Sequence, residues 1–244
     1  MKVLTVHNAK GGVGKTTTTV NLAFNLSTKG YDVLVLDLDP QSNTTPFFTK
    51  QNERGRNVRD LFLEPDKTDK FIRKTKYDHI NIIKGSIKLS EDIFIETEEK
   101  DHILEKALNN ISEDFDYVII DCPPSFQHIS LNAINASDLI ITPVILDGFC
   151  RDNLYTEKSI IEDSDTDAEW IVFANKWSNK KIYKKILADL VDKHDYPFAE
   201  SAVSDRVAVS SASDYRKPLL KHSKLNTATL DYMNLTDEII EMEN

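Results

Sequence analysis

The run K-G-G-V-G-K-T-T over residues 10–17 combines residue types that together bind phosphate groups. Glycines let successive backbone N–H groups turn toward an anion without a clash from Cβ atoms. A following helix adds free N–H groups and the positive end of its dipole. We expect Lys15 to contact β- and γ-phosphates, the Thr16 hydroxyl to coordinate Mg²⁺, and Thr17 to lie near the α-phosphate. The expected nucleotide-binding residues of this run are Lys10, Gly11, Gly12, Val13, Gly14, Lys15, Thr16 and Thr17.

This loop departs from the standard phosphate-loop pattern G-x-x-x-x-G-K-[ST], because the first glycine of that pattern falls on Ala9. It meets instead a variant with a second lysine, K-G-G-x-G-K-[ST]-T. The dinucleotide-binding pattern G-x-G-x-x-G is also unmet, since Thr17 occupies the position of its third glycine. That difference argues against a nicotinamide or flavin site.

Two acidic motifs follow apolar runs elsewhere in the chain. In D-L-D-P-Q, Asp37 and Asp39 are two residues apart, so an extended chain places both carboxylates on one side. Asp121 ends the apolar run Y-V-I-I-D and is followed by C-P-P-S. Such an acid suits a magnesium ion held through water. We expect Cys122, beside it, to be a small buried residue.

Short apolar runs, typical of strands buried on both faces, alternate with segments of helical spacing. The expected strands are 3–6, 33–36, 79–83, 117–120, 139–141 and 170–173. The expected helices are 16–27, 101–112, 127–136, 150–163, 179–194 and 225–242, whereas 43–76 is polar and broken. This alternation predicts an α/β fold with a doubly wound, mostly parallel sheet flanked by helices, as one domain over 1–244. The polar motifs should converge at the carboxyl ends of its strands.

The composition excludes several classes of protein. The chain has 244 residues, of which 40% are hydrophobic and 29% are charged, as in a globular protein. No run of about 18 apolar residues and no signal-peptide pattern is present. Cys122 and Cys150 are too few for a disulfide framework or a zinc cluster. We therefore expect a cytoplasmic protein with no membrane partner.

The charge is unevenly distributed. The net charge of -10 argues against a nucleic-acid binder, but residues 176–224 carry +5 and the remainder carries -15. From charge alone, a solvated helix face and a basic patch both stay open. The candidate DNA-binding residues are Lys180, Lys181, Lys184, Lys185, Arg216, Lys217, Lys221 and Lys224.

The loop at 10–17, the D-L-D-P-Q run and the D-C-P-P-S run together resemble the ParA/MinD superfamily of deviant Walker A ATPases. The similarity is close over 2–45 and 114–150, and loose over 46–113 and beyond 176. The resemblance implies a P-loop NTPase fold that binds ATP and Mg²⁺. It also implies a homodimer in the ATP-bound state, with two nucleotides between the subunits.

The resemblance further assigns roles to single residues. The early lysine, Lys10, reaches across the dimer to the partner's nucleotide, and Asp37 lies in the outer coordination sphere of Mg²⁺. Asp39 orients the attacking water, and Asp121 holds Mg²⁺ through water. The catalytic residues are then Lys10, Lys15 and Asp39, and the metal-binding residues are Thr16, Asp37 and Asp121.

The base-binding part of the site is less defined. Asn175 follows an expected strand, where its amide can bind an adenine edge, and the family often has a base-contacting residue there. A turn or capping role is the alternative. Residues 201–219 resemble a partition-family segment with Ala212 and Pro218 retained, but most of its polar positions differ. Adenine contacts in this segment therefore stay open.

Local chemistry narrows the branch of the superfamily. The tail 231–244 is acidic, unlike the basic membrane helix of MinD-type proteins, and the cysteines do not suit an iron–sulfur cluster. The chain begins at the first expected strand, which leaves no room for a helix-turn-helix domain. We therefore expect a small, Soj-type ParA partition ATPase with slow intrinsic turnover, associated with the nucleoid. Its partners would be a second copy, non-specific DNA and a ParB-like or cargo adaptor.

Two alternatives stay open. The same ATPase could position a non-DNA cargo such as a carboxysome or a chemoreceptor cluster. Less favoured is an enzyme similar to dethiobiotin synthetase, which joins ATP to a small substrate. The D-L-D-P-Q run and the second lysine fit a dimer switch better than such an enzyme.

Overall fold

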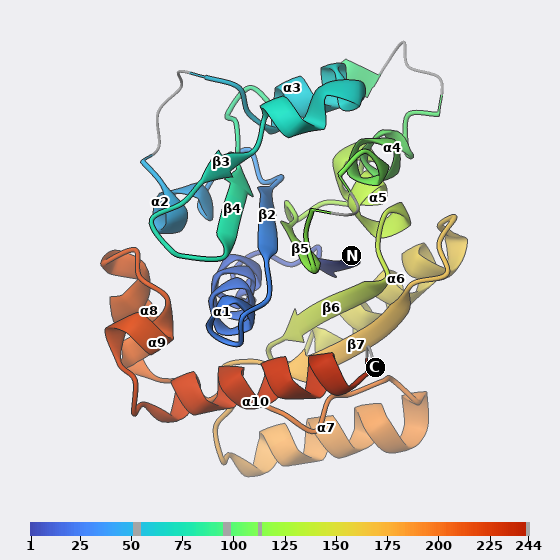
Figure 1. Cartoon of the computed structure of the whole chain (residues 1–244). Helices are drawn as coiled ribbons and strands as arrows, with labels where there is room; N and C mark the ends of the chain where they lie inside the picture. Colours follow the sequence, from blue (N-terminus) through green and yellow to red (C-terminus); the bar gives the residue numbers. More distant parts are fainter. Residues whose placement is uncertain (51–54, 95–98, 112–113, 243–244) are drawn as a thin grey trace.

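The computed structural model describes residues 1–50, 55–94, 99–111 and 114–242. Within them lies a seven-stranded sheet with the order β3-β4-β2-β5-β1-β6-β7 (Figure 1). The strands are β1 (Lys2–Val6), β2 (Val33–Asp37), β3 (Arg73–Lys74), β4 (Ile80–Ile83), β5 (Tyr117–Asp121), β6 (Leu139–Val144) and β7 (Glu169–Ala174). The helices are α1 (Lys15–Thr28), α2 (Thr45–Phe48), α3 (Val58–Leu63), α4 (Ile103–Asn109), α5 (His128–Asn135), α6 (Cys150–Asp163), α7 (Lys181–His194), α8 (Val207–Asp214), α9 (Leu219–His222) and α10 (Thr227–Met242). Two 3₁₀ helices are η1 (Pro65–Lys70) and η2 (Glu91–Phe94).

The sheet is parallel except at one edge, where the two-residue β3 pairs antiparallel with β4. β1 lies between β5 and β6, and β2 lies on the other side of β5. The register of β2 and β5 sets Asp37 directly opposite Asp121. The loops that leave the carboxyl ends of β1, β2 and β5 therefore emerge side by side, as the parallel arrangement requires.

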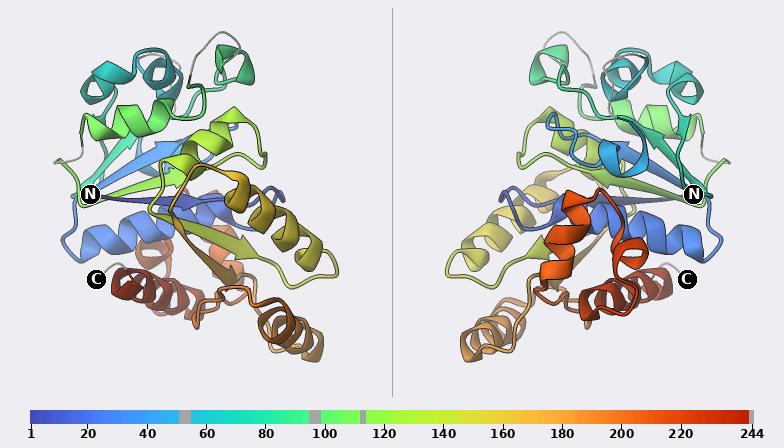
Figure 2. Two further views of the ribbon diagram at one scale, coloured as in Figure 1. Left: turned by 90° about the vertical axis from the view of Figure 1, so that its right-hand side faces the viewer. Right: turned by 90° about the vertical axis from the view of Figure 1, so that its left-hand side faces the viewer.

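Helices cover both faces of the sheet (Figure 2). On one face α1 packs between the strands and α10, and one core cluster unites their buried side chains with those of α8 and α9. On the other face α3, α4 and α5 form a second cluster. A third cluster joins α6 and α7 to β6 and β7. Because α1 is covered on two sides, most of its residues are buried, which fixes the helix that follows the phosphate loop.

The expected order of strands and helices is confirmed, as are the doubly wound α/β class and the mostly parallel sheet. The expected helix over 101–112 is shorter, because α4 spans Ile103–Asn109, and residue 112 lies outside the described residues. The expected helix over 179–194 begins at Lys181 and that over 225–242 begins at Thr227. The polar stretch 43–76 holds α2, α3, η1 and β3, elements too short for periodicity to reveal.

No helix among the described residues is both long enough and apolar enough to cross a bilayer.

Candidate nucleotide-binding site

The phosphate loop connects the end of β1 to the first turn of α1. Gly12 and Gly14 have φ angles of 75° and 106°, in the left-handed region that favours glycine. A Cβ on Gly14 would lie 2.2 Å from Asn175 Nδ2, so that position also has no room for a side chain. Gly11 and Gly12 are exposed and leave the loop backbone open to a ligand. The free N–H groups at the start of α1 face the same side.

Lys15 lies buried at the centre of the loop. Its ammonium donates to the carbonyl oxygens of Asn8 at 2.8 Å and Lys10 at 3.3 Å. Burial lowers the pKa of Lys15, and the Asp121 carboxylate acts against that shift. Neutral carbonyls compensate a buried cation only in part, so this position suits the charge of a phosphate group.

Asp37 and Asp121 lie opposite each other on β2 and β5, and both are fully buried. One oxygen of Asp121 accepts hydrogen bonds from the hydroxyls of Thr16 at 2.8 Å and Thr44 at 2.6 Å. One oxygen of Asp37 accepts from the Thr45 backbone N–H and hydroxyl, both at 2.7 Å. The second oxygen of each carboxylate is buried and has no hydrogen-bond partner among the described residues.

These two unpartnered oxygens are suited to a metal ion or to the water molecules that surround one. Burial raises the pKa of Asp37, and the neighbouring Asp121 charge adds to the shift. Burial also raises the pKa of Asp121, against the hydrogen bonds from Thr44 and Thr16. A divalent cation would compensate both charges, and carboxylate, hydroxyl and water oxygens are what Mg²⁺ prefers. The residues therefore fit Mg²⁺ beside the Thr16 hydroxyl.

Asp39 lies just beyond β2 and is half-buried. One of its oxygens accepts a hydrogen bond from the Gln41 backbone N–H at 2.9 Å, which orients the carboxylate. Its charge contributes to the raised pKa values of Asp37 and Asp121, so it faces the same region. Its other oxygen carries no hydrogen bond from the described residues and is free to bind water.

The two lysines of the phosphate loop are held in different ways. Lys10 is not drawn into the loop: its ammonium lies 2.5 Å from Asp147, after β6, and 29% of its side chain is exposed. Partial burial acts to raise the pKa of Asp147, but the hydrogen bonds from Lys10 and from the Phe149 backbone, together with the Lys10 charge, outweigh it and the pKa is lowered. Asp147 is oriented in turn by the Phe149 backbone N–H at 3.0 Å. Lys10 thus lies partly exposed, and Asp147 is its one charged partner among the described residues.

Asn175 and Lys176, after β7, clamp the phosphate loop. The Asn175 amide donates to the Val13 carbonyl at 2.6 Å, and its oxygen accepts from the Lys176 backbone N–H at 2.8 Å. The Lys176 ammonium donates to the Gly12 carbonyl at 3.0 Å. These contacts give Asn175 a role in holding the loop, and its contact with a base stays a prediction.

A pocket of about 570 Å³ opens beside this clamp. One wall is formed by Gly14, Thr17, Asn175 and Lys176, next to the start of α1. The other wall comes from 204–214, within the segment that departs from the family pattern. Whether this pocket holds the base of a nucleotide stays a prediction, as do adenine contacts in 201–219.

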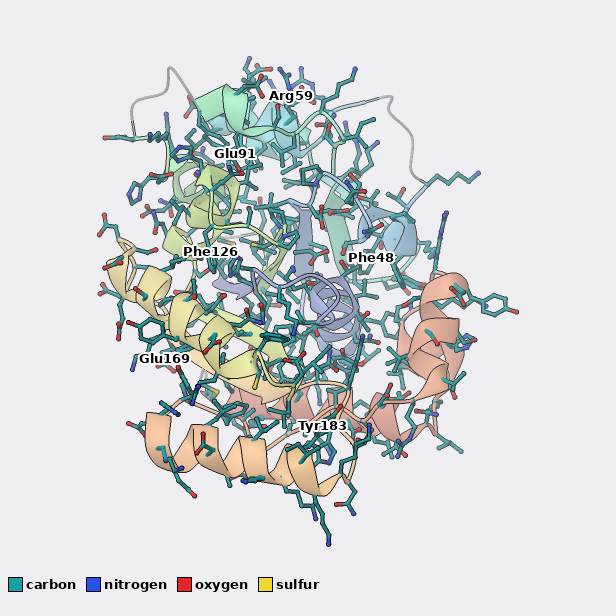
Figure 3. All side chains as sticks on the ribbon, turned by 180° about the vertical axis from the view of Figure 1, so that it is seen from behind. Phe48, Arg59, Glu91, Phe126, Glu169 and Tyr183 are labelled. Atoms are coloured by element: carbon teal, nitrogen blue, oxygen red, sulfur yellow. The ribbon has the colours of Figure 1, made fainter. Side chains whose placement is uncertain are left out.

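The eight candidate DNA-binding residues are all exposed but do not form one patch. Lys180 precedes α7, and Lys181, Lys184 and Lys185 lie on its first turns, near Tyr183 (Figure 3). The other four lie at the end of α8 and around α9, which pack near α1 and not near α7 (Figure 1). Those four are Arg216, Lys217, Lys221 and Lys224. The fold thus divides the basic segment into an α7 group and an α9 group.

The α9 group gains a residue that the sequence analysis did not include. Lys76, after β3, lies close enough to Lys217 for that charge, together with burial as the larger cause, to lower its pKa. Lys76 and Lys221 line one pocket, and Lys221 lies 5.7 Å from the Phe24 ring centroid. Within the described residues, no carboxylate forms an ion pair with Lys76, Lys217 or Lys221.

The sequence analysis also missed Thr44, Thr45, Gly85 and Asp147. Thr44 and Thr45 follow the D-L-D-P-Q run closely, and their hydroxyls suit a neighbouring carboxylate. A Cβ on Gly85 would lie 2.8 Å from Asp37 Cγ, so only glycine fits there. Gly85 comes two residues after the expected strand 79–83, so the rule that strand ends carry the site would have found it. Asp147 lies six residues after the expected strand 139–141, because β6 continues to Val144.

A family model described as an AAA domain, AAA_31, matches residues 1–166. The sporulation initiation inhibitor protein Soj of Bacillus subtilis is 26% identical over 247 residues, which cover 98% of this chain and 98% of Soj. The chromosome partitioning protein ParA of Caulobacter vibrioides is 27% identical over 254 residues, covering 100% of this chain and 95% of that protein.

A solved structure of cobyrinic acid a,c-diamide synthase from Mycobacterium smegmatis, with bound ADP and magnesium, has the same fold. The TM-score is 0.84 at 23% identity, over 98% of this chain and 94% of that one. The match over 1–166 covers the phosphate loop and both acidic motifs. The chain therefore belongs to the AAA domain family AAA_31 and is an ATPase of the ParA/MinD superfamily.

Proposed function

We propose that this ATPase binds ATP and Mg²⁺ at the sheet edge and acts as a ParA-type partition switch. ATP brings two chains together in a sandwich homodimer, and the dimer binds nucleoid DNA without sequence preference. A ParB-like adaptor then stimulates ATP hydrolysis, which releases the dimer from DNA. Repeated cycles of binding and release segregate a plasmid or a chromosome. The similarity to a chromosome partitioning ParA supports this proposal.

The observation that carries the proposal is the contrast between Lys15 and Lys10. Lys15 is buried among carbonyls of its own loop, whereas Lys10 lies at the surface on Asp147. A lysine held by one partly exposed carboxylate can exchange that partner for phosphate oxygens at small cost. Lys10 is thus suited to complete the site of a second copy, as an arginine finger does.

The contacts of the remaining residues are compatible with the roles that the resemblance implies. Lys15 and the loop N–H groups would bind the phosphates, and Thr16, Asp37 and Asp121 would hold Mg²⁺, the last two through water. When bound, Mg²⁺ neutralises charge on the phosphate oxygens. Asp39 orients the attacking water with its free oxygen. Lys10 from the partner stabilises the charge that develops in the transition state.

The α9 group, with Lys76, is the better candidate for the DNA-binding surface. Burial is the main cause of the lowered pKa of Lys76, and the nearby Lys217 charge adds to it, so these two cations lie close together. A phosphate backbone would relieve their repulsion. In α7 the lysines share the helix with the carboxylates of Asp189 and Asp192, which lower the net positive charge of that surface. Dimerisation would double the number of phosphate contacts on either surface.

The test is binding of fluorescent random-sequence duplex DNA at one low salt concentration, with ATP, with ADP and without nucleotide. We expect binding with ATP alone, lost on raising salt and lost in Lys10→Ala. Lys29→Ala, which removes an ion pair with Asp237 on the α10 side, is the control. Full ATP turnover and full dimerisation in Lys10→Ala would overturn the proposal.

The other two functions are outcomes of further measurements on the same protein. A positioning ATPase would keep DNA binding, so an adaptor from a non-DNA cargo in a pull-down would favour it. ATP-dependent dimerisation without DNA binding would favour a role that does not involve DNA. Turnover that is independent of DNA and requires a small acid would favour the enzyme similar to dethiobiotin synthetase.

A further inference from the structure

A histidine–glutamate pair is buried beside the nucleotide site and has no role in the site described above. His7 follows β1 and Glu157 lies on α6, and their side chains are 0% and 2% exposed. His7 Nδ1 is hydrogen-bonded to Glu157 Oε1, and His7 Nε2 lies 2.8 Å from the Ser125 carbonyl oxygen. Burying two polar side chains costs free energy, so packing alone does not account for this pair.

The chemistry of the partners fixes the hydrogen bonds of the ring. A carbonyl oxygen can only accept, so His7 Nε2 carries a proton and donates it to Ser125. A second proton is shared between Nδ1 and Glu157, whichever of the two holds it. The Phe126 ring lies 5.3 Å from the imidazole, centroid to centroid, and is labelled in Figure 3. The imidazole is therefore held in one orientation from both ends.

Glu157 stands where an apolar residue would serve the packing of α6. The buried positions of this helix are Cys150, Leu154 and Glu157, spaced four and three residues apart, which is its core-facing stripe. The Glu157 charge also acts on Lys15, raising its pKa against the larger effect of burial. Glu157 thus lies on the core-facing side of α6, where its carboxylate is hydrogen-bonded to His7.

The pair joins three segments that contact the nucleotide site. β1 runs through His7 into the phosphate loop, and Ser125 lies four residues beyond the metal-binding Asp121. Glu157 lies two turns along α6, which begins three residues after Asp147. The Cys150 backbone N–H also donates to the Asp147 carbonyl at 3.2 Å, which ties that residue to the helix start.

We propose that His7 is a positioning residue that couples the loop after Asp121 to α6 and, through Asp147, to Lys10. A shift of Ser125 when nucleotide and metal bind pulls on the imidazole, and Glu157 transmits the shift to α6. The start of α6 then moves with Asp147, and Lys10 is released for the partner's nucleotide. The proposal depends on the role of Lys10 given under Proposed function only in its last step.

The experiment removes both members of the pair together, since a single change leaves a buried polar partner behind. In His7→Leu/Glu157→Leu, apolar residues keep the packing, which is often neutral or stabilising for a buried pair. We expect kcat for ATP to fall about 10-fold to 100-fold, as for a misplaced catalytic group, and KM to change less than about twofold. The matched control is His102→Leu/Glu105→Leu, a histidine–glutamate pair at the start of α4 whose side chains are 32% and 51% exposed, which should keep wild-type kcat. A folded His7→Leu/Glu157→Leu protein with wild-type kcat would overturn the proposal.

A measurement on the unaltered protein decides the matter if that variant does not fold. In ¹⁵N-histidine-labelled protein, the His7 ring N–H should exchange slowly with water, because His7 is buried. Slow exchange identifies its signal, since each of the other five histidines is exposed or half-exposed. We expect its resonance to shift when Mg²⁺ and a non-hydrolysable ATP analogue are added. An unchanged His7 resonance with saturating nucleotide would overturn the coupling.

These readouts separate the two proposals. If Lys10→Ala keeps full turnover, the role of Lys10 fails, but the kcat of His7→Leu/Glu157→Leu and the His7 resonance still test the coupling to α6. If instead Lys10→Ala is inactive and His7→Leu/Glu157→Leu is fully active, the switch stands and the histidine has no positioning role.

Discussion

The carboxyl edge of the sheet and the basic segment over 176–224 encode function in different ways. At the sheet edge, strand register and hydrogen bonds fix each group, so that Asp37 faces Asp121 and Lys15 is held by backbone carbonyls. In the basic segment the charged groups are exposed and are carried by separate helices. A site that needs fixed distances is therefore recognisable from short sequence motifs. A charged surface depends instead on where the fold places helices that lie apart in space.

The largest effect should come from the sheet edge, in Lys15→Gln. Glutamine cannot supply the buried positive charge that faces the phosphates, so we expect ATP turnover to fall by at least about 10³-fold, with loss of ATP binding. Turnover and the affinity for a fluorescent ATP analogue would be measured together. Lys158→Gln, on the exposed side of α6, is the control and should match wild type. Near-normal ATP affinity in Lys15→Gln would show that the loop binds phosphate through its backbone alone.

The basic segment should respond in a graded way that depends on salt. We expect Lys217→Gln/Lys221→Gln/Lys224→Gln to make the negative slope of log K against log salt shallower by about 3 per chain, where K is the DNA association constant. Each lost phosphate contact removes about 0.9 from that slope. The comparison variant is Lys181→Gln/Lys184→Gln/Lys185→Gln, which removes the same charge from α7. Equal losses in the two variants, measured by DNA binding with ATP over a series of salt concentrations, would contradict the preference for the α9 group.

The sequence predicts the site at the sheet edge better than it predicts the arrangement of the basic segment. Strand order along the chain, the parallel sheet and the meeting of the loop with Asp37 and Asp121 follow from apolar runs that end in polar motifs. Thr44 and Thr45 were missed because their partners are set by the path of the chain after β2, which periodicity does not describe. The division of the basic segment into two groups was missed because α8 and α9 pack near α1, which is distant from them in the sequence.

Asp37→Asn tests how much the buried carboxylates at the sheet edge cost in stability when no metal is bound. Burial and the Asp121 charge raise the pKa of Asp37, so without metal the native state loses stability as pH rises from the unfolded value of 3.8 toward the raised value. Asparagine keeps an acceptor for Thr45 and removes the charge. We expect the variant to gain about 2 kcal/mol without Mg²⁺, or about 4–8 °C in Tm, with a larger gain near pH 8 than near pH 5.

Thermal unfolding at both pH values, with and without Mg²⁺, checks this expectation. The control is Asp39→Asn, because Asp39 is only half-buried and should leave Tm nearly unchanged while turnover falls. A variant Asp37→Asn that is less stable than wild type at neutral pH would mean that water or a bound cation already compensates the buried carboxylates.

The smallest effect should come from Asp147→Asn, which frees Lys10 with little change of shape. The amide oxygen introduced by this substitution can still accept from the Phe149 N–H, but the neutral amide no longer attracts the Lys10 ammonium. A partly exposed pair of this kind contributes up to about 1 kcal/mol, or about fivefold, so the dimer, which uses Lys10 of both chains, should strengthen by up to about 25-fold. Sedimentation with a non-hydrolysable ATP analogue measures the change, and Asp152→Asn, an exposed residue in the first turn of α6, is the matched control. Weaker dimerisation in Asp147→Asn alone would mean that Asp147 holds Lys10 in the orientation that the dimer uses, so that the ion pair prepares the switch and does not restrain it.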